Sequence, residues 1–77
     1  RLQTSAPGQV LAFLRIQERN SVLVVLNLSS QADLHFEIVD PRLSGRYRNL
    51  YSGATNDFRS DKSFEMQPWE HLIYTAE

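Results

Sequence analysis

The two histidines are the first side chains to consider for catalysis or metal binding. His35 and His71 both fall in runs that predict strands, and neither has a second His at ligand spacing; the chain contains no Cys. Side-chain catalysis needs a nucleophile with its base, a pair of carboxylates or a metal cluster. The sequence contains none of these arrangements, so we expect no catalytic residue, no metal site and no cofactor in this chain.

One polar segment, residues 52–62, carries oxygen ligands of the kind that Ca²⁺ prefers, on Asn56, Asp57 and Asp61. Their spacing matches no EF-hand loop, and the glycine that such a loop requires is missing. We therefore expect these groups to face water and to make local Asx turns.

A basic stripe beside Tyr47 and Tyr51 could serve as a surface for single-stranded nucleic acid. It would consist of Arg42, Arg46, Arg48 and Arg59. Several aspartates lie in the same region, and eight Lys and Arg against nine Asp and Glu leave a formal charge of −1. Such a balance provides no general attraction for polyanions, so we expect no nucleic-acid partner.

Aromatic side chains offer a third chemistry, because a pyranose ring presents an apolar face on which an exposed aromatic ring can stack. The candidate carbohydrate-binding residues are Trp69, Tyr47 and Tyr51. Alternatively, these rings close the core and place their polar groups at its rim. For Trp69, which lies between a proline and the last predicted strand, closure of the core is the favoured interpretation.

Apolar runs separated by turn residues define the elements that would carry these side chains. They predict six strands, over residues 10–17, 22–28, 34–39, 46–51, 63–66 and 71–76. Polar residues 18–21 predict an antiparallel hairpin between the first two strands, and Phe58 is the apolar residue that could anchor the loop over residues 52–62. Short strands at this spacing predict one all-β domain, a small antiparallel β-sandwich or barrel.

The second predicted strand is apolar on both faces, because residues 22–26 read VLVVL without alternation. One face would pack on the core of the domain, and the other needs a cover, such as a neighbouring domain or subunit. We expect Leu11, Phe13, Leu23 and Val25 to lie against that cover or against the core. No apolar run reaches the roughly 18 residues of a membrane span, so we expect no membrane partner, and the sequence assigns no compartment.

Three segments together resemble the C-terminal β-domain of the alpha-amylase superfamily, as in oligo-glucosidases and maltogenic amylases. They are "VLAFLR" (residues 10–15), "SVLVVLNLS" (residues 21–29), with its Asn-apolar-Ser ending, and "FEMQPWEHLIY" (residues 64–74). The resemblance implies an antiparallel β-sandwich with Greek-key connections, packed on a catalytic (β/α)₈ barrel of the same chain. The first residue is Arg1, and the family commonly has an additional strand before the first segment, so we expect residues 1–77 to be a single domain excised from a larger enzyme.

The resemblance implies a non-catalytic domain that braces the barrel of an α-glucan- or oligosaccharide-active glycosidase, with α-glucan as a further partner. Leu11, Phe13, Leu23 and Val25 would then contact the barrel, and their exposure in a fragment would favour a dimer. Two alternatives stay open. The first is a stand-alone sugar-binding module with Trp69, Tyr47 and Tyr51 on one surface; the second is an immunoglobulin-like structural sandwich, without the Cys…Trp…Cys spacing.

Overall fold

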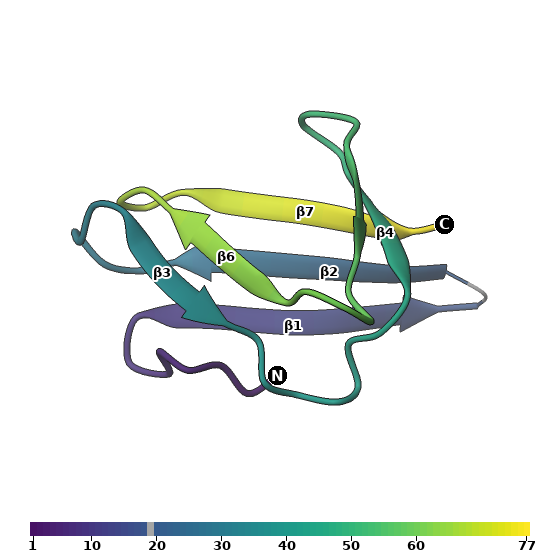
Figure 1. Ribbon diagram of the computed structural model, residues 1–77, viewed down its shortest axis with the longest axis horizontal. Coiled ribbons are helices and arrows are strands. Elements are labelled where there is room, and N and C mark those ends of the chain that lie inside the picture. The colour runs from purple at the N-terminus through teal and green to yellow at the C-terminus, as the bar shows by residue number, and fades with distance from the viewer. Residues whose placement is uncertain (19) are drawn as a thin grey trace.

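The structure is a computed structural model that describes residues 1–18 and 20–77, and only the backbone of Gln17. The chain forms antiparallel strands without a helix in the described residues, as expected for an all-β protein (Figure 1). The strands are β1 (Val10–Gln17), β2 (Asn20–Asn27), β3 (Leu34–Glu37), β4 (Arg46–Asn49), β5 (Thr55–Asp57), β6 (Ser63–Met66) and β7 (His71–Ala76).

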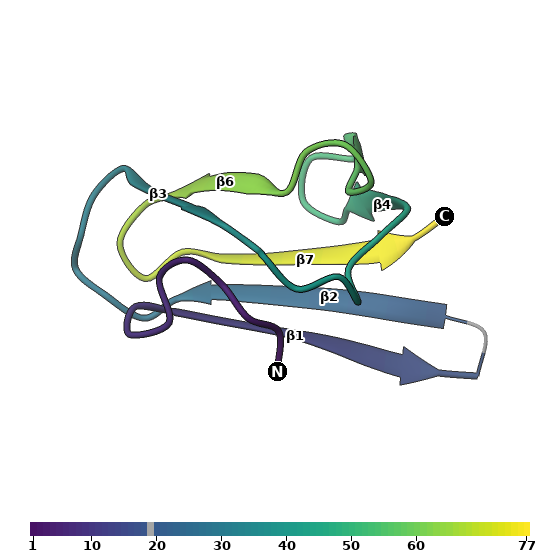
Figure 2. The same cartoon turned by 60° about the horizontal axis from the view of Figure 1, so that its bottom comes forward.

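The strands form two layers, which Figure 2 shows one above the other. The larger sheet has the order β1-β2-β7-β4-β5, and the smaller sheet pairs β3 with β6. The chain passes from β2 to the small sheet, returns for β4 and β5, crosses again for β6, and finally inserts β7 between β2 and β4. These crossings confirm the small β-sandwich with Greek-key connections.

The strand predictions are confirmed with shifted ends and one omission. The first, fifth and sixth predicted strands coincide with β1, β6 and β7. The segment over residues 52–62, expected to be a loop, contains the short strand β5, whose Asn56 pairs with Tyr47 of β4. Its sequence, TND, has neither apolar residues nor alternation, and it is a strand because β4 supplies a partner.

The hairpin between β1 and β2 is confirmed, with a shorter connection than residues 18–21. Asn20 already pairs with Gln17, and the register runs from there to Val10 opposite Asn27. Glu18 has φ +58°, the left-handed backbone that a tight hairpin turn needs. Arg19, part of the predicted connection, lies outside the described residues.

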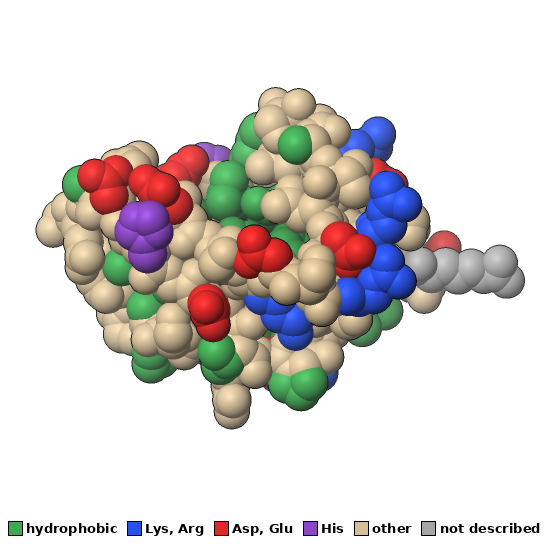
Figure 3. Space-filling view, in the orientation of Figure 1, with side chains coloured by type: hydrophobic (Ala, Val, Ile, Leu, Met, Phe, Trp, Pro, Cys, Tyr) green, Lys and Arg blue, Asp and Glu red, His purple; other side chains and the backbone are tan. Residues whose placement is uncertain are grey.

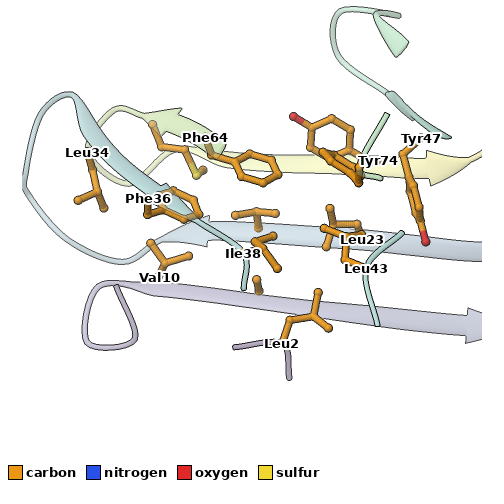
Figure 4. Packing of buried hydrophobic residues seen from close by; sticks show 14 residues of the cluster. Leu2, Val10, Leu23, Leu34, Phe36, Ile38, Leu43, Tyr47, Phe64 and Tyr74 are labelled. Carbon is orange, nitrogen blue, oxygen red and sulfur yellow. The ribbon is translucent and has the colours of Figure 1, made fainter. Parts of the chain in front are cut away.

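The core lies between the two sheets and has an aromatic cluster at its centre (Figure 4). Phe58 is only 1% exposed, and its ring centroid lies 5.4 Å from Tyr74, 5.5 Å from Tyr47 and 5.6 Å from Phe64. The prediction that Phe58 anchors its loop is therefore confirmed. The rest of the buried apolar set is Leu2, Val10, Ala12, Leu23, Val25, Leu34, Phe36, Ile38, Leu43 and Met66.

A buried asparagine at the end of β2 explains the Asn-apolar-Ser segment. Asn27 is 1% exposed, and its Nδ2 donates to the carbonyl of Gln67 at 2.8 Å and to that of Gln31 at 3.4 Å. Its Oδ1 accepts from the backbone N–H of Ser29 at 3.1 Å and from the Ser29 hydroxyl at 2.7 Å. Because a buried amide must be hydrogen-bonded, Asn27 fixes the β2–β3 connection against the β6–β7 turn.

A buried carboxylate fastens the connection between β3 and β4. Asp40 accepts from the guanidinium of Arg42 at 2.6 and 3.0 Å, from the Arg42 N–H at 3.0 Å and from the Gln3 N–H at 3.2 Å. The Lys62 ammonium donates to the Asp40 carbonyl at 2.9 Å. The Arg42 hydrogen bonds hold the pKa of the Asp40 carboxyl well below its usual range.

Candidate functional site

The face of the large sheet that points away from the small sheet is apolar at the centre of its three longest strands. We call it the outer face; its apolar members are Leu11, Phe13, Val22, Val24, Leu26 and Ile73, and the register also places Arg15, His71 and Thr75 on it. The side chains are neighbours in register: Val24 of β2 lies between Phe13 of β1 and Ile73 of β7. All six apolar side chains are half-buried. Antiparallel sheets facing water usually carry polar side chains there, so this face is suited to a partner.

The four residues expected against a core or a cover divide between the two faces of the sheet. Leu23 and Val25 point inward and are 0% exposed in the domain's own core. They have no surface left for a neighbour, so the expectation of a barrel contact is corrected for both. Leu11 and Phe13 lie on the outer face. Successive side chains of β2 point to opposite faces of the sheet, which separates Leu23 and Val25 from their neighbours. Val22, Val24 and Leu26, which the sequence did not single out, therefore lie on the outer face.

A second surface lies where the β4–β5 hairpin projects beyond β7, and hydrophobic side chains gather in the hollow there (Figure 3). We call it the aromatic depression. It has a volume of about 550 Å³ and is lined by Asn49, Tyr51, Ser52, Trp69, Glu70, His71 and Leu72. Pairing of β4 with β7 extends from Tyr47↔Ala76 to Asn49↔Tyr74. The Leu50 N–H still donates to the Ile73 carbonyl at 2.9 Å, and the earlier β7 residues His71 and Leu72 line the depression.

The aromatic depression receives Trp69 from the β6–β7 turn, which several hydrogen bonds fix in place. The Gln67 N–H donates to the Glu70 carboxylate at 2.9 Å, and the Glu70 N–H donates back to the Gln67 carbonyl at 3.1 Å. The Trp69 N–H donates to the Ser29 carbonyl at 3.3 Å. The buried Asn27 also holds this turn, because its Nδ2 donates to the Gln67 carbonyl. Trp69 itself has φ +60°, a left-handed conformation uncommon for a bulky residue.

Tyr51 enters the aromatic depression from the turn between β4 and β5. The Asn49 Oδ1 accepts from the N–H of Tyr51 at 2.8 Å and from that of Ser52 at 3.2 Å. The Gly53 N–H donates to the Asn49 carbonyl at 2.8 Å. The Tyr51 ring stands edge-on to the His71 ring, with centroids 5.5 Å apart and planes at 85°. Both aromatic side chains are thus presented by turns of defined geometry.

The three candidate carbohydrate-binding residues do not share one surface. Tyr51 and Trp69 are 58% and 65% exposed and both line the aromatic depression. The interpretation that Trp69 closes the core is therefore wrong. Tyr47 is 5% exposed and packs on Phe58, so its assignment to a sugar surface is corrected. The difference arises because Tyr47 points inward from β4, whereas Tyr51 lies beyond the end of that strand.

The charged side chains form local pairs. The Arg59 guanidinium donates to the Asp57 carboxylate at 2.9 and 3.0 Å and lowers the pKa of Asp57 to about 2. The Asp57 and Asp61 carboxylates accept backbone N–H groups two residues further on, which confirms the predicted Asx turns at these two residues. Asn56 instead lies in β5, where it pairs with Tyr47. Among the described residues, no three His, Asp or Glu side chains are grouped in a way that could bind a metal ion. His35 lies 3.8 Å from Glu65 on the exposed side of the small sheet.

The architecture defines a class of protein, a small all-β domain built as a sandwich of unequal sheets. Comparison with protein-family models matches residues 3–74 to the alpha amylase C-terminal all-beta domain, and the chain belongs to that family. This confirms the resemblance inferred from the sequence. Domains of the family are normally attached to a catalytic barrel in the same chain. Searches of the curated proteins and of the solved structures found no match. The described residues form no helix with the length and hydropathy of a transmembrane segment.

Proposed function

We propose that this domain braces the catalytic (β/α)₈ barrel of a glycoside hydrolase that acts on α-glucans or related oligosaccharides. The chain would not itself catalyse hydrolysis; the paired carboxylates that cleave a glycosidic bond would lie in the barrel. The name of the matched family supports the substrate class.

The observation that carries the proposal is the outer face. Leu11, Phe13, Val24 and Ile73 lie side by side on the face of the large sheet that points away from the small sheet, and all four remain half-buried. Burying apolar side chains contributes about 25 cal/mol per Å² removed from water, so covering this face would stabilise both partners. The same driving force would favour self-association when the domain is alone, as we predicted for the fragment.

The substitution Val24→Thr tests the proposal at the centre of the outer face. Thr has nearly the shape of Val, but its hydroxyl needs a hydrogen bond when buried. In the isolated domain water can reach the half-buried side chain, and we expect a free-energy change of unfolding below about 0.5 kcal/mol. In the complete enzyme, where the barrel would cover it, we expect a loss of about 1–3 kcal/mol.

The matched control is Val39→Thr, the same chemical change at a side chain that is 52% exposed next to the small sheet. It should leave thermal unfolding of both the isolated domain and the complete enzyme unchanged. The isolated domain is compared at a concentration at which sedimentation shows it to be monomeric, because self-association would also cover Val24. Equal effects of Val24→Thr in the two contexts would mean that the barrel does not cover the outer face, and the proposal would be wrong.

A further inference from the structure

We infer that the aromatic depression is a binding site for an α-glucan chain, in addition to the bracing role. The choice of an α-glucan rests on the proposed function, whereas the existence of the site rests on the geometry below. The site would let the domain hold substrate at a distance from the barrel's catalytic carboxylates.

The exposed aromatic rings carry the inference. Among the described residues, the large hydrophobic side chains that are exposed include two aromatic ones, Tyr51 and Trp69, and both line the same depression. They come from turns 18 positions apart in the sequence, Tyr51 from the β4–β5 hairpin and Trp69 from the β6–β7 turn. Exposed aromatic rings are costly for solubility, and their convergence on one hollow is typical of a binding surface.

The backbone geometry also favours a ligand over a structural explanation. Trp69 is 65% exposed and is absent from the core cluster, so its indole does not serve packing of the sandwich. It nevertheless occupies φ +60°, where Gly or Asn would be favoured. The two hydrogen bonds between Gln67 and Glu70, and the one that the Trp69 N–H donates to the Ser29 carbonyl, hold the turn in this form. A strained residue that its surroundings fix in place is a pointer to function.

The chemistry of the lining fits a sugar better than a polyanion or a purely apolar partner. Aromatic faces accept the C–H face of a pyranose, because their π-systems are electron-rich. Around them Ser52, Glu70 and His71 bring a hydroxyl, a carboxylate and an imidazole, which donate to and accept from sugar hydroxyls. The Glu70 carboxylate would repel a phosphate backbone. The volume of about 550 Å³ lies in the roughly 300–1,000 Å³ range of small-molecule sites.

The test is a titration of the isotope-labelled 77-residue chain with maltoheptaose, followed by backbone amide shifts. We expect saturable shifts in residues 49–53 and 67–72, with a Kd of about 1 mM, as for a shallow and open site. Trp69→Ala and Tyr51→Ala should each weaken binding about tenfold or more, since the loss of one stacking ring has an effect of that size on the binding of nucleic-acid bases. Trp69→Phe keeps a ring and should restore most of the affinity.

Val39→Ala is the matched control, an exposed hydrophobic side chain outside the aromatic depression, and should bind as the unmodified chain does. Both exposed rings can be removed without disturbing the core, and the amide spectrum verifies the fold of each variant. Cellohexaose, which has the same sugar with β-linkages, should bind more weakly. Equal binding of the two sugars would overturn the assignment to α-glucan.

Two results would overturn the inference as a whole: no shifts at about 20 mM maltoheptaose, far above the expected Kd, or undiminished binding by both alanine variants. If Trp69→Ala instead lowers the thermal stability of the complete enzyme and no sugar binds, the depression belongs to the contact with the barrel. Failure here leaves the bracing role untouched, because that role is tested at Val24 on the outer face. Conversely, equal effects of Val24→Thr in both contexts would leave the sugar titration valid.

Discussion

Replacing Phe58 by Ala tests the packing at the centre of the sandwich. The ring is 1% exposed and lies within 5.4–5.6 Å, between centroids, of Tyr47, Phe64 and Tyr74. A Phe→Ala change in such a site costs about 3–5 kcal/mol, from lost transfer free energy and the cavity left behind. A domain of this length has a total stability of about 4–11 kcal/mol. The substitution would therefore remove a large fraction of the stability of the domain.

The assay is urea and thermal unfolding followed by circular dichroism, because the single Trp is exposed and reports poorly on the core. At about 4–8 °C per kcal/mol for a domain of this size, Phe58→Ala should lower Tm by more than about 12 °C. Phe58→Leu, which keeps an apolar group in the site, should cost about 1–1.5 kcal/mol. A loss below about 1 kcal/mol for Phe58→Ala would show that the ring is not packed as described and would refute this reasoning.

Two further predictions concern the loops. Folding lowers the pKa of the Asp40 carboxyl. The ionised carboxylate therefore stabilises the fold at every pH above its unfolded-state pKa of about 3.9. This stabilisation is lost as the pH falls from that value towards the lower folded-state pKa. Asp40→Asn should therefore lower Tm most at pH 7 and progressively less below about pH 4; a difference in Tm that stays constant over this range would contradict the role of the charge. Gly45 has φ +99°, and Gly45→Ala should cost about 1–2 kcal/mol. The control is Gly8→Ala, because Gly8 has no positive φ; it should change the free energy of unfolding by less than about 0.5 kcal/mol in the same urea assay. Equal losses of stability for Gly45→Ala and Gly8→Ala would contradict the argument from positive φ.

Local pattern and turn chemistry were enough to predict the class of fold and most strands. Leu34, Phe36 and Ile38 alternate with other residues in the sequence, a pattern typical of a strand with one buried face, and all three are buried. The strand β5 could not be predicted, because its pairing with β4 is a tertiary contact that its polar residues do not encode. Its partner residues become apparent only when the hairpin is seen in three dimensions.

The functional surfaces were predictable only in part. A strand that is apolar on both faces predicts a second buried face, but periodicity alone does not say which residues point inward. Leu23 and Val25 could therefore not be told from Val22 and Val24. The exposure of Trp69 depends on a left-handed backbone in the β6–β7 turn, which is held both by local hydrogen bonds and by bonds to the distant residues Ser29 and Asn27. The buried role of Asn27, by contrast, could have been suspected from a polar residue that ends an apolar run.

The position of β7 has a consequence for how the chain can fold during synthesis. Among the strands of the described residues it comes last in the sequence, yet it lies between β2 and β4 in the large sheet. Until residues 71–76 leave the ribosome, β1–β2 and β4–β5 are separate hairpins, each with an open edge. The nascent domain therefore displays unpaired strands over most of its translation, a state prone to aggregation. A nonsense mutation just before His71 would remove a central strand and not an edge strand, and it would leave β1–β2 and β4–β5 without a connection in the large sheet.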